Sequence, residues 1–248
     1  MKSFLSILII CSIIFTTQSI AQQKPMTLKE KIKRFAPTDI RGDVSKLSKG
    51  DRKALAKLIE AAKIMDSLYL RQVWSGNTDL LHKLRSDKST GSKERLRYFI
   101  INMSPWSGID HQEPFIEGVP KPRPTGANYY PEDMKKEKFE KWISTLPDAE
   151  KAKATGFFYT IHAEEDGKFK TVPYNEEYKD LLAPAGKLLR DAAELTDNAT
   201  LKNFLMKRAD AFLSNDYYAS DVAWMELDSP IEPTIGPYEV YMDELFNY

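Results

Sequence analysis

The sequence has 248 residues, of which 42% are hydrophobic and 29% are charged, and its 36 basic residues balance its 36 acidic residues. A chain of this length and composition can bury a core without disulfides or a structural metal. Because the formal net charge is zero, the chain has no general excess of basic residues for phosphates, and neither nucleic acid nor an anionic membrane is an expected partner.

The first 21 residues are predicted to be a secretory signal peptide. Lys2 is followed by an apolar run over 4–15, and a small-residue cleavage site ends at Ala21. A retained membrane anchor is the alternative, but the run is shorter than the ~20 residues that span a bilayer. The single cysteine, Cys11, lies inside this run, so the exported chain has no thiol for a disulfide, a nucleophile or a metal. We expect an exported protein, periplasmic or extracellular, without a membrane segment after cleavage.

Residues 22–104 are predicted to form an N-terminal helical region. Its clearest element is a long amphipathic helix over 51–74, in which apolar residues recur at steps of three and four. Ser48 and Asp51 have the spacing of an N-terminal capping box. Shorter helices are expected near 28–35, 79–84 and 92–103.

A proline-rich loop is predicted over 105–131, which holds six of the 14 prolines of the chain. Unstructured connections of this length are uncommon and usually functional, so the loop is either a crossing between domains or a functional loop. Its aromatic residues argue against simple disorder, because they are expected to pack on other residues. They are Trp106, Phe115, Tyr129 and Tyr130.

Residues 132–248 are expected to hold further helices and a β-hairpin near the middle of the chain. Pro131 is predicted to open a helix over 132–146. The apolar runs 157–161 and 169–172 flank an Asp-Gly pair, which is typical of a hairpin turn.

Two more helices are predicted over 175–195 and 199–213. Pro184 is expected to kink or restart the first, and Asn198 to cap the second. The fold class predicted from these patterns is mainly α with a small β part, an α+β fold.

The three histidines, His82, His111 and His162, have none of the spacings that zinc sites use, so no metal site can be identified in the sequence. The acidic residues that follow His162 form a candidate ligand cluster with it. Their position before a hairpin turn favours a solvated turn instead.

The tail from Asn215 interleaves carboxylates and aromatic residues without a plain helical period. Three prolines and a glycine restrict its backbone, as a segment that builds a site requires. The chemistry of the residues leaves two alternatives open, a packed connection and a ligand-lining strand.

Residues 235–241, IGPYEVY, followed by MDELF, resemble the Gly-x-x-Glu-x-Tyr-x-Asp segment of the dipeptidyl peptidase III family of zinc exopeptidases. The stretches 212–246, 114–120 and 126–133 resemble the bacterial branch of this family. The resemblance implies a two-lobed metallopeptidase, a hydrolase that removes dipeptides from peptide N-termini in a cleft that closes on its substrate.

The resemblance assigns roles to two residues of this tail. Glu239 matches the family's glutamate that holds the free α-amino group of the substrate, and Tyr241 matches the tyrosine that steadies the tetrahedral intermediate. A carboxylate pairs with an ammonium group, and a phenol can donate to a developing oxyanion. Placed two residues apart on a strand, the two side chains would share one face.

The family's zinc ligands lie C-terminal to this segment, in a His-Glu-x-x-x-His motif and a later glutamate, and the sequence stops at Tyr248 before any of them. We therefore expect an N-terminal portion of such an enzyme, from a truncated reading frame or an incomplete sequence. Residues 132–248 are then an incomplete domain that ends in a cleft-lining segment. Zn²⁺ belongs to the complete enzyme, peptides are its substrates, and this chain alone is expected to be inactive. The alternative is a non-catalytic exported protein, either a peptide-binding module or a structural helical protein.

Overall fold

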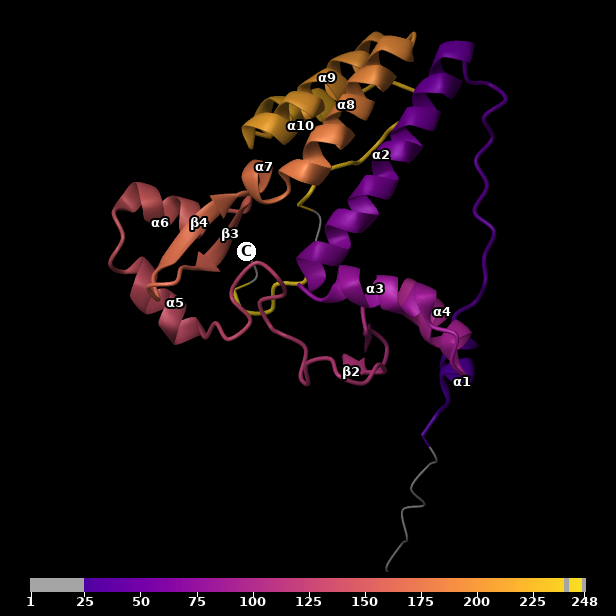
Figure 1. The fold of residues 1–248 in the computed structure, drawn as a ribbon. Helices are drawn as coiled ribbons and strands as arrows, with labels where there is room; N and C mark the ends of the chain where they lie inside the picture. Colours follow the sequence, from indigo (N-terminus) through magenta and orange to yellow (C-terminus); the bar gives the residue numbers. More distant parts are fainter. Residues whose placement is uncertain (1–24, 239–240, 247–248) are drawn as a thin grey trace, which may run out of the picture.

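The computed structural model describes residues 25–238 and 241–246, which form a mainly helical fold with two small antiparallel sheets (Figure 1). The predicted α+β class is confirmed. The predicted signal peptide lies outside the described residues. The described helices are α1 (Leu28–Ile32), α2 (Lys49–Val73), α3 (Asn77–Ser86), α4 (Ser92–Asn102), α5 (Lys136–Ile143), α6 (Asp148–Ala154), α7 (Tyr174–Glu177), α8 (Lys179–Leu195), α9 (Ala199–Ser214) and α10 (Tyr218–Met225). The described strands are β1 (Trp106–Ser107), β2 (Glu113–Pro114), β3 (Tyr159–Ala163) and β4 (Phe169–Pro173).

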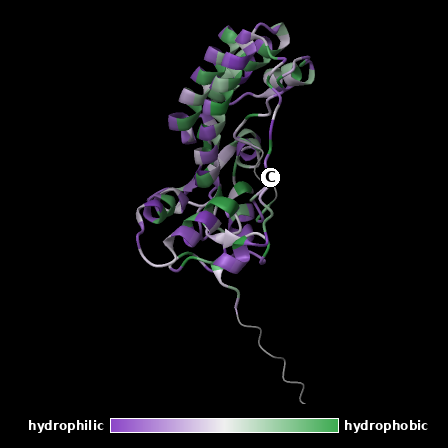
Figure 2. Cartoon of the chain, turned by 90° about the vertical axis from the view of Figure 1, so that its right-hand side faces the viewer, coloured by the Kyte–Doolittle hydropathy of each residue, from purple (hydrophilic) through white to green (hydrophobic). Residues whose placement is uncertain are grey.

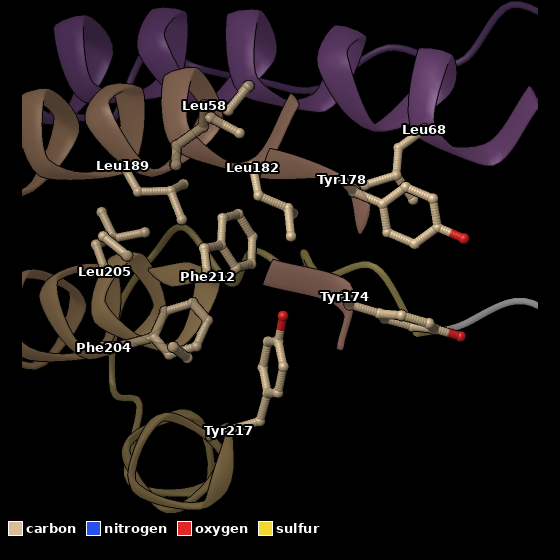
Figure 3. Packing of buried hydrophobic residues seen from close by; sticks show 14 of the residues in the cluster. Leu58, Leu68, Tyr174, Tyr178, Leu182, Leu189, Phe204, Leu205, Phe212 and Tyr217 are labelled. Atoms are coloured by element: carbon tan, nitrogen blue, oxygen red, sulfur yellow. The ribbon is translucent and has the colours of Figure 1, made fainter. Parts of the chain in front are cut away.

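The longest helix, α2, packs along α8, which in turn packs against α9 (Figure 1). Figure 3 shows this core from close by, with leucines of α8 lying between α2 and the aromatic rings of α9. Leu182, Leu189 and Phe204 are completely buried in it, and burial of side chains of this size stabilises the fold by about 1.5–3 kcal/mol each. The helices carry hydrophilic and hydrophobic residues together (Figure 2), as helices with one buried face do. Among the described helices, none is long and apolar enough to cross a bilayer.

The start of α2 forms one half of the predicted capping box. The Ser48 side chain accepts a hydrogen bond from the Asp51 backbone N–H at 2.9 Å. The Asp51 carboxylate instead accepts from the Thr196 hydroxyl, at 2.5 Å and in a buried position. The second half of the box is thus replaced by a contact that joins the first turn of α2 to the α8–α9 connection.

The proline-rich segment 105–131 packs against the rest of the molecule and contains the β1–β2 pair, which was not predicted. The backbone N–H of Asn128 donates to the carbonyl oxygen of Gln72 at 2.9 Å, and its side-chain amide donates to that of Arg71 at 2.8 Å. These carbonyls lie in the last turn of α2, where helical partners run out. Three of its aromatic side chains are buried, as expected: Trp106, Tyr129 and Tyr130.

The helix predicted over 132–146 is shorter and begins later than expected. Pro131 is not its first residue, because residues 131–134 form a turn in which the Met134 N–H donates to the Pro131 carbonyl at 2.8 Å. This turn buries Met134 in the main core. The seven-residue helix α6 follows α5 and was not predicted, although its Ala, Glu and Lys residues are good helix formers.

The predicted hairpin is confirmed as β3–β4, with Tyr159 paired to Pro173 and Ala163 to Phe169. Gly167 in its turn has a φ of 80°, a conformation that glycine adopts without steric penalty. The helical stretch that follows does restart, but at Tyr178, where α7 ends and α8 begins. Pro184 lies inside α8, so its predicted role in restarting the helix was wrong.

The first part of the tail is helical, contrary to expectation, since it forms α10. The buried face of α10 consists of the small residues Ser220 and Ala223. The large residues Tyr218 and Met225 are 78% and 80% exposed. The spacing of the large hydrophobic residues therefore does not correspond to the buried face of α10. For this reason the helix was not predicted from the sequence.

Candidate functional site

The candidate site lies in the segment 226–246, which follows α10. Residues 226–238 form neither a helix nor a strand and run beside α2 toward the centre of the molecule (Figure 1). A hollow of about 510 Å³ lies between residues 231–236 and the α2 side chains that include Leu58 and Ile59. The described part of the segment contains no strand, and it packs on the core through Ile231 and Ile235.

The side chain of Tyr238, directly before Glu239, is held by two helices. Its hydroxyl accepts a hydrogen bond from Arg208 of α9 and donates one to Asp221 of α10, at 3.2 Å. Arg208 and Asp221 also form an ion pair, with 2.7 Å between Nη2 and Oδ1. The Tyr238 ring packs edge-on against Tyr217, with 5.0 Å between centroids. These contacts tie the position of Tyr238 to the helical core.

The ion pair is asymmetric, because the Arg208 side chain is 4% exposed and that of Asp221 is 50% exposed. Burial lowers the pKa of Arg208, and Asp221 opposes this effect. Arginine is effectively always protonated in proteins, so the guanidinium remains charged at neutral pH. It also lies over the rings of Phe204 and Tyr238, at 5.2 Å and 5.4 Å from their centroids.

Gly236 allows the Tyr238 ring to fold back over the backbone. A Cβ atom at position 236 would lie 2.6 Å from a carbon of that ring. Any larger residue would therefore force either the ring or the backbone of this segment to shift.

The backbone of the same segment is fixed by Gln72, near the end of α2. The Gln72 side-chain amide donates to the carbonyl oxygen of Pro237 at 2.6 Å. Gln72 is completely buried. A helix residue 165 positions earlier in the chain thus sets the path of the backbone two residues before Glu239.

The residues that follow Tyr241 are held by the proline-rich loop. The Tyr130 hydroxyl donates to the buried carboxylate of Asp243 at 3.1 Å. Glu244 pairs with Arg123, with 2.5 Å between Oε1 and Nη2, and its N–H donates to the Thr125 carbonyl at 2.7 Å. The loop therefore has a defined structural role, which is to support the residues that follow Tyr241.

The structure places one of the two predicted site residues. Tyr241 lies in a turn at the surface, and its side chain is 89% exposed. Glu239 lies outside the described residues. Their assigned roles stay predictions.

The histidines lie apart, on α3, in the proline-rich loop and on β3. His162 contacts Glu177 of α7, with 2.9 Å between Nε2 and Oε2, whereas Glu164 and Glu165 are exposed. Across residues 25–238 and 241–246, no group of three or more His, Cys, Asp or Glu side chains could hold a metal ion. The described residues therefore do not fit a zinc site.

Gln72 and Arg208 were not identified from the sequence, although a signal was present. Arg208 lies four residues after Phe204 and four before Phe212, on the buried stripe of α9. Gln72 follows Leu68 by four residues on the buried side of α2. A polar residue within an apolar stripe needs a buried partner, and this rule would have marked both.

The fold and sequence match two solved structures of dipeptidyl-peptidase III. The enzyme from Corallococcus sp. strain EGB is 56% identical and superposes with a TM-score of 0.86, over 90% of this chain. The enzyme from Caldithrix abyssi is 46% identical, with a TM-score of 0.84 over 89% of this chain. The resemblance to a portion of dipeptidyl peptidase III is confirmed. This chain spans 41% of each of the two solved peptidase chains.

A curated relative carries a different name. Nudix hydrolase 3 of Arabidopsis thaliana is 34% identical in an alignment of 275 positions. The alignment covers 92% of this chain and 36% of that protein. Nearly two thirds of the plant protein thus lies outside the match. No protein-family model matches the chain.

Proposed function

We propose that this chain supplies the N-terminal part of an exported, zinc-dependent dipeptidyl peptidase. The similarity to two dipeptidyl-peptidase III structures, at 46% and 56% identity over about nine tenths of the chain, carries the proposal. Peptides are then the substrates. The apolar run that precedes Ala21 supports export to the periplasm or the cell exterior.

In this proposal Glu239 binds the α-ammonium group of the peptide. A carboxylate placed there measures the distance from the N-terminus to the bond that is cut, which explains release of two residues at a time. Tyr241 donates a hydrogen bond to the oxyanion that forms at the scissile carbonyl. Its high exposure supports this role, because an exposed phenol is accessible to a ligand.

Zinc would be bound by residues other than those described, since these provide no ligand group. This chain then contributes substrate binding and orientation. We expect the purified chain to release no dipeptides when zinc is added. If the chain binds peptides but does not hydrolyse them even when it is joined to the remainder of a related peptidase, the non-catalytic alternative is favoured.

The test is a chimera in which this chain replaces the matching portion of the Corallococcus enzyme. Fold similarity and 56% identity make the exchange practicable. We expect it to release dipeptides from a fluorogenic dipeptide substrate. Glu239→Gln should raise KM about 10- to 100-fold, because it removes a charge-assisted hydrogen bond. Tyr241→Phe should lower kcat by about 10²- to 10³-fold.

Two matched controls carry the same chemical change at residues to which no role in binding or catalysis is assigned. Glu232→Gln removes an exposed carboxylate from the same segment, and Tyr218→Phe removes a hydroxyl from an exposed tyrosine of α10. Both should leave KM and kcat unchanged. The proposal is contradicted if the folded chimera is inactive, or if the control variants reduce its activity as much as the site variants do.

A further inference from the structure

The turn that begins with Tyr241 is held from the proline-rich loop by Arg123. The turn and the loop lie side by side (Figure 1). The Arg123 guanidinium contacts two residues of the turn, with Nη1 3.4 Å from the Met242 sulfur and Nη2 2.5 Å from Glu244 Oε1. A single side chain thus contacts the first and the third residue after Tyr241.

Arg123 is itself held in place. Its side chain is 3% exposed, and it lies between Pro122 and Pro124. Proline has a fixed φ and keeps the residue before it extended, so the backbone at Arg123 has little freedom. Two residues later, the Thr125 carbonyl accepts the Glu244 N–H at 2.7 Å. The guanidinium therefore contacts the turn from a restricted position.

The buried charge of Arg123 favours one position of the turn. Among the described residues, Glu244 is the one acidic side chain that forms an ion pair with Arg123. A buried cation that loses its partner is strongly destabilising. A shift of the turn away from the loop would leave such a cation unpaired. The arrangement in which Arg123 contacts Glu244 is therefore more stable than one in which the turn has moved.

We propose that Arg123 is a positioning residue for Tyr241, because it holds the turn that carries the phenol. The proposal rests on the proposed role of Tyr241 as a donor to the oxyanion. It goes beyond that role, because it assigns the alignment of the phenol to a buried side chain of the proline-rich loop. Tyr241 is 89% exposed, so its location depends largely on the backbone that carries it. A donor to an oxyanion stabilises the transition state only when its geometry is held within a narrow range.

Arg95 offers a control with the same chemistry. Its Nη2 lies 2.6 Å from Asp87 Oδ2 and 2.5 Å from the Ser89 hydroxyl oxygen, so it also joins a guanidinium to a loop. The Arg95 side chain is 27% exposed, and no role in binding or catalysis is assigned to its loop. Arg123→Met and Arg95→Met therefore remove the same group, and only the first removes the contacts with the turn.

The first measurement is hydrogen exchange on the purified chain, which needs no enzyme activity. Arg123→Met should speed exchange in peptides that span 241–246 by about tenfold, as the loss of one charged hydrogen bond allows. The Tyr130 hydrogen bond to Asp243 remains, so the turn is loosened and not released. Exchange in α8 and α9, and exchange of 241–246 in Arg95→Met, should be as in wild type. Equal exchange of 241–246 in wild type and Arg123→Met would overturn the proposal, whatever the activity of the chimera.

Arg123→Lys takes the place of the methionine variant if that variant does not fold. Lysine keeps the positive charge, but its single ammonium group does not reproduce the planar fork that contacts Met242 and Glu244 together. Exchange of 241–246 should then be about threefold faster than in wild type. Wild-type exchange in a folded Arg123→Lys variant would equally contradict the positioning role.

The second measurement is a double-mutant cycle in the chimera. Arg123→Met alone should lower kcat about tenfold and change KM less than about twofold, because the phenol acts in the transition state. In a Tyr241→Phe background the same substitution should change kcat less than about twofold, since Arg123 acts through Tyr241. Additive effects, or an equal loss of kcat in Arg95→Met, would overturn the positioning role. If Tyr241→Phe leaves kcat unchanged while Arg123→Met speeds exchange, the proposed role of Tyr241 is refuted, and the contact that holds the turn still stands.

Discussion

Arg208 and Asp221 are bonded to each other but differ in exposure, and this difference sets their energetic roles. The Arg208 side chain is 4% exposed, whereas Asp221 retains contact with solvent at 50%. Removing a half-exposed carboxylate leaves a buried cation without its counter-charge. Removing the arginine leaves a carboxylate that water can solvate. A buried charge that loses its partner is among the most destabilising changes in a protein.

We therefore predict that Asp221→Asn destabilises the chain more than Arg208→Met does. The first should lower the free energy of unfolding by about 3 kcal/mol. The second should lower it by about 1–2 kcal/mol, through loss of hydrogen bonds to Asp221 and Tyr238. Urea unfolding followed by circular dichroism measures both values. Equal losses, or the reverse order, would contradict this account of the pair.

At the scale of elements, α1 is attached through a cluster of charges around Asp110. Its carboxylate accepts from Lys31 at 2.7 Å and from both terminal nitrogens of Arg34, at 2.8 Å and 2.6 Å. Ser107 adds a further hydrogen bond at 2.8 Å. The Arg34 hydrogen bonds, followed by that from Lys31, hold the pKa of Asp110 well below its usual range. No residue of α1 itself is buried, so this cluster is its main attachment.

We predict that Asp110→Asn releases α1 without unfolding the helical core. Trypsin should cut after Arg34 severalfold faster, and stability of the attachment should fall by about 1 kcal/mol, since the pairs are partly exposed. Asp39→Asn removes a carboxylate from an exposed pair and serves as the control. An unchanged cleavage rate at Arg34 would contradict the attachment role.

The same cluster has a defined pH dependence. A carboxyl whose pKa is lowered in the folded state stabilises that state, and the stabilisation is complete above the unfolded pKa of ~3.9. It is lost as the pH falls through the lower pKa of the folded state. The attachment of α1 should therefore persist at pH 4 and weaken only in stronger acid. In Asp110→Asn, protection of α1 from exchange should be weak at every pH.

The elements that could be predicted are those whose signals are local. The long helix α2 has a complete apolar period, and the β3–β4 hairpin has an Asp-Gly turn between apolar runs. α10 could not be predicted, because its neighbours allow only small residues on its buried face. Likewise, the break between α7 and α8 lies at Tyr178, whereas the local signal indicated Pro184, which lies inside α8.

The candidate site was predictable only in part, for the same physical reason. The tail could be identified from its own residues and from its resemblance to a family. Its supports could not, because Gln72 lies 165 positions from Pro237 and Arg208 lies 30 positions from Tyr238. A single sequence marks such residues as polar within an apolar stripe, but it does not name their partners.

At the scale of the whole molecule, one core joins parts of the chain on both sides of the proline-rich loop. The main cluster includes Leu58 and Ala61 of α2 together with residues of α8, α9 and the segment that precedes Tyr238. The segment that carries Glu239 and Tyr241 is anchored to this core on one side and to the loop on the other. This arrangement suits a chain that presents one wall of a substrate site and relies on further residues for the metal.

If this chain forms one wall of a dipeptidyl peptidase, the enzyme removes residues two at a time from a free N-terminus. Mass spectrometry of a hexapeptide of six different residues, digested by the chimera with zinc, tests it most directly. We expect the N-terminal dipeptide and the remaining tetrapeptide as the first products, with no cleavage of the N-acetylated peptide. Release of single residues, internal cleavage or equal cleavage of the acetylated peptide would contradict it.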